Sequence, residues 1–224
     1  MKRIHGRSGM AISIVFIVLV SAAYVLGWSS LFTVKQVVVV GSPNPSETFV
    51  IQHSIRVGGK MARLESQAIA KSLKTYTWLD HSTISRNWFK GIVTVRVWTR
   101  TPIAQFHNHL VDEAGIVFDL PSVDASHLPT IAGPDAASAK FAVNILTALP
   151  LQLRSQVRSI LVHGSDSAIL TINDLTLDRA LTVAWGDETN TALKVQVYQA
   201  LVALPENSKI HAIDLSAPHA PIVK

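Results

Sequence analysis

The residues best placed to do chemistry in this sequence are two histidines followed closely by two carboxylates. His107 and His109 are two residues apart, so they share one face of an extended strand, and Asp112 and Glu113 follow soon after. Imidazole and carboxylate groups are common zinc ligands, so the set resembles a metal site. Asp112 also begins the sequence Asp-Glu-Ala-Gly, which is typical of a hairpin turn with Gly115 at positive φ. The turn accounts for Asp112, and we therefore expect neither a metal ion nor a cofactor.

A second stretch, Asp80-His81-Ser82, contains the residue types of a hydrolytic triad. Neighbouring residues cannot converge on one point, and the members of real triads come from distant segments. The chain has no cysteine, which excludes thiol nucleophiles, thiolate metal sites and disulfides. It also lacks a glycine-rich phosphate loop, a nucleophile elbow and an H-E-x-x-H motif. Four tryptophans are expected to pack in the core or on a sheet face, with a carbohydrate-stacking platform as the alternative: Trp78, Trp88, Trp98 and Trp185.

The elements that must position any site begin with an uncharged apolar run over residues 10–28. As a helix this run would be about 28 Å long, close to the roughly 30 Å hydrocarbon core of a bilayer. The sequence therefore predicts a transmembrane helix over residues 10–28. Basic residues in the preceding tail, residues 1–9, place the N-terminus in the cytoplasm and residues 29–224 outside the plasma (inner) membrane. The rival interpretation is a cleaved signal peptide, which is disfavoured because the apolar run continues past Ser21-Ala22-Ala23.

Charge is distributed unevenly along the rest of the chain. Residues 32–101 contain ten Lys and Arg and three acids, a net charge of +7, whereas residues 102–224 contain seven Lys and Arg and twelve acids, a net charge of −5. A basic region next to a bilayer can rest on anionic headgroups, meet an acidic partner, or simply be a solvated face. Nucleic acid is not an expected partner because this part of the chain is predicted to lie outside the cytoplasm.

The pattern of residues 29–101 predicts a small α+β domain. The expected order is β-α-α-β-β, with both helices on one face of the sheet. Ser46 is expected to be the N-cap of the first helix. This helix is expected to end at the sequence Arg56-Val57-Gly58-Gly59-Lys60. The remaining elements are expected over residues 32–40 (strand), 66–76 (helix), 78–86 (strand) and 92–98 (strand).

The pattern of residues 102–224 predicts a β-rich domain with two helices. The helices are expected from Asp135 to about Leu149 and over about 190–204, because both have an apolar stripe at helical spacing. The strands are expected over residues 103–106, 110–112, 117–118, 158–163, 168–173, 181–185, 209–215 and 220–223.

Several strings, taken in order, resemble the FtsQ/DivIB family of bacterial cell-division proteins. The strings are Phe32-Thr33-Val34 up to Gly41, Gly58-Gly59, Trp78-Leu79, Ile84-Ser85-Arg86-Asn87-Trp88, Arg100-Thr101-Pro102-Ile103-Ala104, the hairpin of residues 110–118, Leu128-Pro129 with Gly133, Trp185-Gly186, Lys194 and Ile213-Asp214-Leu215. Two residues depart from the family pattern: Phe89 stands where proline is usual, and Ser216 stands where arginine is usual.

The resemblance implies a membrane-anchored, non-enzymatic protein of the division septum, with a POTRA-like domain over residues 29–101 and a β domain over residues 102–224. It further implies that the β domain binds single-pass partners of the FtsB and FtsL/DivIC types. The POTRA module would recruit other division proteins, including septal peptidoglycan synthases of the FtsW/FtsI type. The alternatives are a membrane-anchored POTRA-containing chaperone or secretion component and an anchored cell-wall enzyme.

Two surfaces are candidates for partner binding. A strand at the C-terminus tends to be an edge, which offers unpaired backbone groups to a partner strand, although Pro218 and Pro221 would also blunt such an edge against aggregation. The expected partner-binding residues are Trp185, Gly186, Asp214, Leu215, Ser216, Ala217, His219, Ala220, Ile222 and Val223. The second candidate is a recruitment surface at Arg63, Lys71 and Lys74 of the POTRA-like domain, with a solvated helix face as the rival interpretation.

Overall fold

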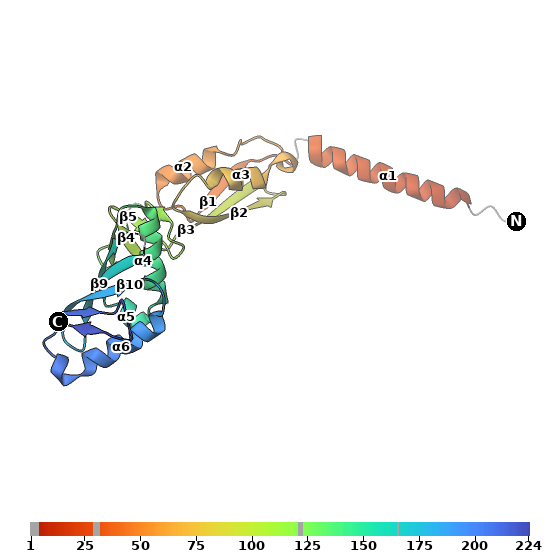
Figure 1. The fold of residues 1–224 in the computed structure, drawn as a ribbon. Helices are drawn as coiled ribbons and strands as arrows, with labels where there is room; N and C mark the ends of the chain where they lie inside the picture. Colours follow the sequence, from red (N-terminus) through yellow and green to blue (C-terminus); the bar gives the residue numbers. More distant parts are fainter. Residues whose placement is uncertain (1–4, 29–31, 121–122, 165) are drawn as a thin grey trace. The chain divides into compact units, whose positions relative to one another are not determined.

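The computed structural model describes residues 5–28, 32–120, 123–164 and 166–224, and it divides the chain into two compact units (Figure 1). The first unit is Met1–Thr99 and the second is Arg100–Lys224. The start of the expected cytoplasmic tail, residues 1–4, and the start of the expected POTRA-like domain, residues 29–31, lie outside the described residues. Helices and strands occur in both units, so the fold is of the mixed α+β class, as expected.

Helix α1 (His5–Trp28) contains the apolar run and begins five residues before it. Its described apolar side chains are exposed; Ile12, for example, is 69% exposed and Phe16 is 66% exposed. Over the residues that the structure describes, no helix meets the length and hydropathy needed to cross a membrane.

The rest of the first unit is a three-stranded sheet with two α-helices and a short 3₁₀ helix. The elements are β1 (Gln36–Val40), α2 (Pro45–His53), η1 (Met61–Arg63), α3 (Ser66–Leu73), β2 (Leu79–Asn87) and β3 (Ile92–Thr99). The sheet order is β1-β3-β2, in which β1 runs parallel to β3 and β2 runs antiparallel to it. The core is formed by buried apolar side chains from the strands and both helices, including Val37, Ile51, Leu73, Val93 and Val95.

Two expectations for this unit are corrected. The first strand begins at Gln36 rather than residue 32, because Thr33 instead forms an isolated bridge with Lys60. The N-cap of α2 is Asn44 rather than Ser46: the Asn44 side chain accepts a hydrogen bond from the Glu47 N–H at 2.8 Å. Proline follows Asn44 at the first helical position, where its missing N–H costs nothing.

The second unit contains a nine-stranded sheet with its helices. Its strands are β4 (Ala104–Phe106), β5 (His109–Val111), β6 (Val117–Phe118), β7 (Thr130–Ala132), β8 (Val157–His163), β9 (Ser167–Asp174), β10 (Arg179–Gly186), β11 (Ala212–Asp214) and β12 (Ile222–Val223). Its helices are α4 (Ala136–Ala148), α5 (Leu151–Arg154), α6 (Thr191–Ala203) and η2 (Pro205–Asn207). The order in the sheet is β12-β11-β10-β9-β8-β7-β4-β5-β6.

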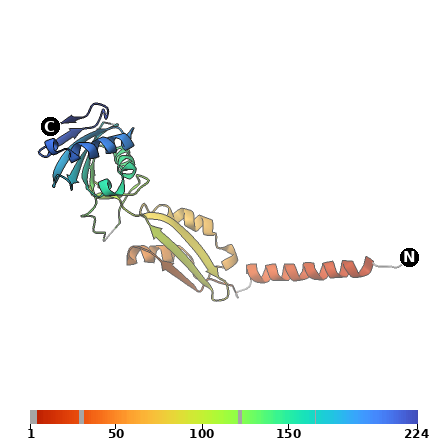
Figure 2. The same ribbon diagram turned by 90° about the horizontal axis from the view of Figure 1, so that it is seen from below.

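One face of this sheet packs against α4 and α6 (Figures 1 and 2). Along β9 the side chains alternate between buried and half-buried, so Leu170 and Ile172 belong to the core while Ile169 and Thr171 lie on the opposite face. The expected strands in this unit are present, but β11 and β12 are shorter than predicted. Strand β7 and helix α5 were not predicted, because each has too few residues to establish a period.

Candidate partner-binding edge of the second unit

Strand β12 is the last strand of the nine-stranded sheet, at the C-terminal end of the chain. It runs antiparallel to β11, with Ile213 opposite Val223 and Asp214 opposite Ile222. The pairing continues to the C-terminus: the Ala212 N–H donates to the Lys224 carbonyl at 3.1 Å, and the Lys224 N–H donates to the Ala212 carbonyl at 2.9 Å. Among the residues that the structure describes, β12 pairs with β11 alone, so the C-terminal strand is an edge of the sheet.

The pairing pattern determines which backbone groups of β12 point outward. Residues of an antiparallel pair alternate between those that exchange hydrogen bonds and those that do not. Lys224 exchanges both of its bonds with Ala212, so Val223, which comes just before it, directs its N–H and carbonyl away from β11. Pro221 lies on the same outward register but has only a carbonyl to offer. The edge thus presents a short set of hydrogen-bonding groups.

The loop before β12 is fixed by its own hydrogen bonds. Asp214 accepts from the Ser216 N–H at 3.0 Å and from the Ser216 hydroxyl at 2.6 Å. These bonds stabilise the charged carboxylate, so the Ser216 hydroxyl, followed by the Ser216 N–H, lowers the pKa of Asp214. The Ala220 N–H donates to the Ala217 carbonyl at 2.9 Å and closes the turn, with Pro218 buried beneath it.

The expected partner-binding residues form two groups, those exposed at the edge and those buried beneath it. Trp185 and Leu215 are fully buried, so their side chains lie under the edge and do not line it. Asp214 is half-buried. Residues whose side chains are exposed along the edge and its loop are Ser216, Ala217, His219, Ala220, Ile222 and Val223.

Gly186, the last residue of β10, is buried and lies close to Ser216 of the C-terminal loop. It follows a β-bulge in the pairing of β10 with β9 and has a φ of +71°. A Cβ at this position would lie 3.0 Å from the Ser216 Cα, which is tighter than ordinary contact. The residue must therefore be glycine for two reasons, its backbone conformation and the close approach of Ser216.

Lys194 supports the same region from within α6. Its side chain is fully buried, and its ammonium donates to the Asp187 carbonyl at 2.9 Å and to the Asp187 carboxylate at 2.8 Å. The ammonium also lies 5.9 Å from the centre of the Trp185 ring. The hydrogen bond from Lys194, with a further bond from Thr189, lowers the pKa of Asp187. The sequence indicated Lys194 only as part of a family string and not in this role. The signal that could have found it is a lysine among the apolar residues of a helix, because a buried lysine is almost always paired.

A small pocket of about 120 Å³ lies beside the edge on the sheet face that the helices leave open. Its walls come from four neighbouring strands, β9 to β12, and consist of Ile169, Thr182, Ala184, Ala212, Ile213, Asp214, Ile222 and Lys224. The sequence did not predict this pocket, because its walls come together only when the order β12-β11-β10-β9 is known.

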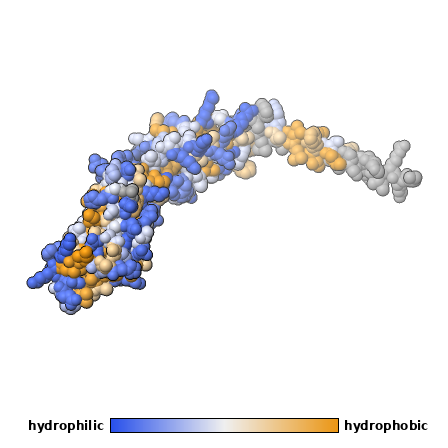
Figure 3. Space-filling model, viewed as in Figure 1, coloured by the Kyte–Doolittle hydropathy of each residue, from blue (hydrophilic) through white to orange (hydrophobic). Residues whose placement is uncertain are grey.

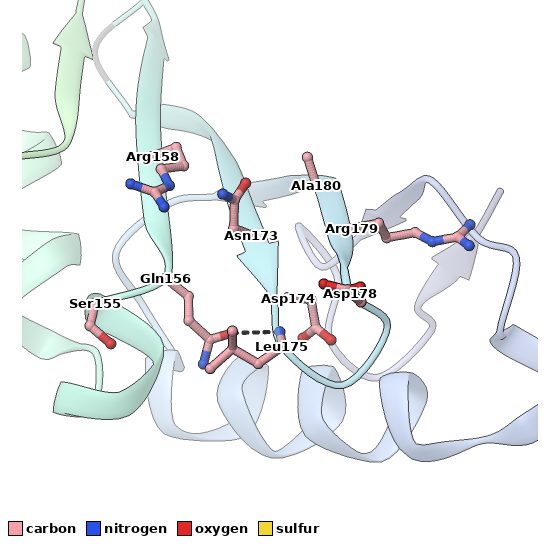
Figure 4. Close-up of a pocket in the computed structure, with 9 residues that line it drawn as sticks. All are labelled: Ser155, Gln156, Arg158, Asn173, Asp174, Leu175, Asp178, Arg179 and Ala180. Atoms are coloured by element: carbon pink, nitrogen blue, oxygen red, sulfur yellow. Dashed lines mark hydrogen bonds between the residues drawn. The ribbon is translucent and has the colours of Figure 1, made fainter. Parts of the chain in front are cut away.

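A second, more polar pocket of about 300 Å³ lies at the turn between β9 and β10 (Figure 4). Asp174 and Asp178 are the acids that line it; the Thr176 and Leu177 N–H groups donate to one carboxylate oxygen of Asp174 at 2.8 Å and the Tyr198 hydroxyl donates to the other at 2.7 Å. Burial, followed by the hydrogen bond to Asp174, raises the pKa of Tyr198 above its ordinary value. Both oxygens of the Asp174 carboxylate thus accept hydrogen bonds from the turn and the core, while Asp178, Arg158 and Arg179 also line the pocket.

The histidines and carboxylates of residues 107–113 do not form one cluster, because His109 and Asp112 bind different partners. His109 pairs with Asp119 at 2.6 Å, whereas Asp112 pairs with Arg100 at 2.6 Å and accepts from the Ala114 and Ile116 N–H groups. Within the described part of the chain no three metal-ligating side chains come together. Asp80 and His81 pair with each other on the surface at 2.7 Å.

The three basic residues proposed for recruitment are exposed on the first unit. Arg63 ends η1, Lys71 lies in the last turn of α3, and Lys74 is the C-cap residue of that helix. They therefore belong to one segment of the unit but to different local elements.

Taken together, the chain is a two-unit α+β protein whose second unit ends in an open sheet edge. The sequence profile of the family described as "Cell division protein FtsQ/DivIB, C-terminal" matches residues 103–216, half of the chain and most of the second unit. The chain therefore belongs to the FtsQ/DivIB family of cell-division proteins.

Individual relatives agree with this assignment. The chain is 26% identical to the cell division protein FtsQ of Mycobacteroides abscessus over 93% of its own length and 66% of that protein's length. It is 23% identical to the FtsQ of Mycolicibacterium smegmatis, over 95% of this chain and 63% of that protein. It is 24% identical to the FtsQ of Salinibacter ruber, over 84% of this chain and 81% of that protein. The chain thus spans slightly less than two thirds of the length of the two mycobacterial relatives.

Proposed function

We propose that this protein is a non-enzymatic scaffold of the division machinery, linking early and late division proteins at the septum and helping to control septal peptidoglycan synthesis. Its proposed partners are single-pass division proteins of the FtsB and FtsL/DivIC types, with septal synthases of the FtsW/FtsI type as further partners. The observation that carries the proposal is the open β12 edge of the second unit, which follows the family-matched residues 103–216.

The edge suits an extended partner segment. A partner strand could pair with the outward N–H and carbonyl of Val223 and with the outward carbonyl of Pro221, which is the geometry of β-strand addition. Ile222 and the pocket of about 120 Å³ beside it would receive side chains of the partner. Gly186, Trp185 and Leu215 would act indirectly by holding the loop and β11 in place.

Helix α1 is proposed as a single-pass anchor of the plasma membrane, with the N-terminus in the cytoplasm and the two units outside. Its 24 residues correspond to about 36 Å of helix. The hydrophobic side chains described along it are exposed, as Figure 3 shows, so they require a partner or a lipid surface to cover them. Anchoring also raises the effective concentration of partners in the same membrane, so a short edge with a weak affinity of its own would suffice.

The rest of the first unit is proposed to be a POTRA module. The order β-α-α-β-β with the sheet order β1-β3-β2 supports this proposal. Within it, Arg63, Lys71 and Lys74 are the proposed recruitment surface. A triple alanine variant at these positions would be expected to lower recruitment of late division proteins without unfolding the unit, because all three side chains are exposed.

The edge can be tested with matched variants of the full chain. Deletion of residues 216–224 should abolish capture of an FtsB-type partner. The single change Val223→Pro removes the outward N–H and should weaken capture about three- to tenfold, the value of one hydrogen bond. Pro221→Ala is the matched control, because it adds an N–H to the same edge and removes none. Equal partner affinity in all of these variants would contradict binding at the edge.

Localisation tests the function as a whole. An N-terminal fluorescent fusion should form a band at midcell before constriction begins. A uniform envelope signal through the whole cell cycle would contradict the scaffold proposal and favour a membrane-anchored chaperone or secretion component.

A further inference from the structure

The first unit gathers three separate segments at one end of its sheet. Strands β1 and β3 are parallel and begin side by side, with Gln36 opposite Ile92. The Lys35 N–H donates to the Gly91 carbonyl at 2.7 Å, and the Val34 N–H donates to the Gly59 carbonyl at 2.8 Å. Residues 32–36, residues 56–61 and the turn between β2 and β3, residues 87–91, therefore meet at this end, which we call the hairpin end.

An exposed phenylalanine projects from the hairpin end. Phe89 is 93% exposed, although it lies in a turn that is well fixed: the Lys90 N–H donates to the Asn87 side chain at 3.0 Å and the Gly91 N–H donates to the Asn87 carbonyl at 2.9 Å. Gly91 has a φ of +70°, and a Cβ there would lie 2.8 Å from the Thr33 carbonyl oxygen, so the turn is pressed against the incoming chain. Phe89 is thus held in solvent by a rigid support.

Aromatic and basic residues surround it. Trp88 packs edge-to-face against Phe32, with the ring centres 6.0 Å apart. Val57, next to the glycines of the second segment, is 59% exposed. Four basic residues belong to the three segments, namely Lys35, Arg56, Lys60 and Lys90, and none of the three acids of residues 32–101 does. Aromatic side chains with lysine and arginine around them are typical of the membrane–water interface.

The chain itself limits how far the hairpin end can be from α1. Trp28 ends α1, and Phe32 follows four residues later, so at most about 14 Å of extended chain separates them. Phe32 is in turn in contact with Trp88. This limit holds whatever the orientation of the helix, because it depends only on the length of the connection.

We propose that the hairpin end is a second membrane-contact site, in which Phe89 and Trp88 enter the interfacial layer of the bilayer and the surrounding basic side chains bind anionic lipid headgroups. This inference rests on the proposed anchoring of α1. The contact would fix the orientation of the first unit on the membrane. An anchor alone is a single attachment about which the unit could rotate, whereas a second contact beside it restricts that rotation.

The absence of cysteine allows a direct test on the full chain in lipid vesicles. Three single-cysteine variants would carry a nitroxide label, Phe89→Cys at the hairpin end, Ile17→Cys in α1, and Leu175→Cys as the control. Leu175 is a matched control because it is an apolar turn residue that is 78% exposed, but in the second unit. The accessibility of each label to oxygen and to a water-soluble nickel complex reports whether it lies in lipid or in water.

The labels at residues 17 and 89 are expected to be accessible to oxygen and shielded from nickel in vesicles that contain phosphatidylglycerol, and the label at 175 to be accessible to nickel. Adding Lys90→Gln to the Phe89→Cys variant should lower the ratio of lipid-contacting to water-exposed label about fivefold, which corresponds to about 1 kcal/mol per lysine at an anionic surface. A larger loss is expected for the Phe89→Cys variant with Lys90 intact in vesicles of phosphatidylcholine alone, because all four basic side chains then lose their anionic headgroups.

The outcomes separate this inference from the proposed function. A label at 89 that is as accessible to nickel as the label at 175, with residue 17 in lipid, would overturn the membrane contact and leave the anchor intact. A label at 17 that is in water would overturn the anchor and the contact together. Lipid contact at 89 that is equal in neutral and anionic vesicles would overturn the part assigned to the basic side chains.

Discussion

The two proposed contact surfaces, the hairpin end of the first unit and the β12 edge of the second, are built in opposite ways. At the hairpin end the contacting groups are side chains, chiefly the exposed Phe89, on a turn fixed by its backbone. At the β12 edge the contacting groups are backbone N–H and carbonyl groups, and the important side chains, Trp185 and Leu215, are buried beneath them. Substitutions at the hairpin end should therefore change binding alone, whereas those behind the edge should change stability as well.

The largest expected effect is that of Trp185→Ala. Trp185 is fully buried in the core of the second unit, so truncation removes a large apolar group and leaves a cavity. The free energy of unfolding should fall by about 3–5 kcal/mol, measured by urea denaturation. Phe89→Ala is the comparison from the first unit and should change stability by less than about 0.5 kcal/mol, since its ring is almost fully exposed. Similar losses for the two variants would contradict the contrast between the surfaces.

The next effect concerns the buried ammonium of Lys194. Asp187→Ala removes its carboxylate partner and leaves the charge in the core with the Asp187 backbone carbonyl. Because an uncompensated buried charge is costly, the free energy of unfolding should fall by about 2–3 kcal/mol. Lys194→Met should cost less, since the carboxylate left behind is half-exposed and can be hydrated.

A double-mutant cycle checks this explanation. Asp187→Ala combined with Lys194→Met should be more stable than Asp187→Ala alone, because the second change removes the stranded charge. Strict additivity of the two losses would show that the ion pair is not what holds the β10–α6 connection. Lys209→Ala, at an exposed lysine of the same unit, is the control for loss of a positive charge.

Gly186→Ala should have a smaller effect, about 1–2 kcal/mol from the left-handed backbone alone. Gly164→Ala is the matched control: Gly164 also has positive φ, +66°, but a Cβ there would meet nothing within 4 Å. Both variants should lose stability, and only Gly186→Ala should also increase amide hydrogen exchange in residues 216–223, because its methyl group would press on Ser216. Equal exchange in the two variants would contradict the proposed link between Gly186 and the edge.

Local sequence patterns predicted most elements of the fold. The alternation in residues 92–98 and the apolar stripe near 136–148 each identify an element, since each pattern comes from a single face packed on a core. The stripe of Leu193, Val197, Leu201 and Leu204 also identifies a helix, but the buried residues of α6 are Lys194, Val195, Tyr198 and Val202. The N-cap of α2 was misplaced by two residues because Asn44 and Ser46 are both good caps on either side of Pro45.

The candidate site was less predictable. The sequence indicated that the C-terminal strand would be an edge, but the division into exposed and buried residues required the sheet order. Trp185 and Leu215 belong to the same expected set of partner-binding residues as the exposed Ser216 and Ile222, and only the pairing of β10 with β11 places them on the helix-covered face. The hairpin end similarly depends on the parallel pairing of β1 with β3, which brings residues distant in sequence together.

The smallest expected effect is a dependence of stability on acid at the β12 edge. The pKa of Asp214 in the folded protein lies below its ordinary value of 3.8, chiefly because of the Ser216 hydroxyl. The unfolded chain therefore binds the proton more readily, and the stabilisation from this group is complete above about pH 4 and is lost as the pH falls through the lower, folded value.

Hydrogen exchange of residues 216–223 should accordingly become faster relative to the rest of the second unit as the pH is lowered from 5 to 3. The comparison is made after correction for the intrinsic effect of pH on exchange. Ser216→Ala removes the main cause of the lowered pKa, so part of this acid sensitivity should disappear in that variant. If instead the exchange in Ser216→Ala depends on pH as strongly as in the unmodified protein, the acid sensitivity of the loop does not come from the hydrogen bond between the Ser216 hydroxyl and the Asp214 carboxylate.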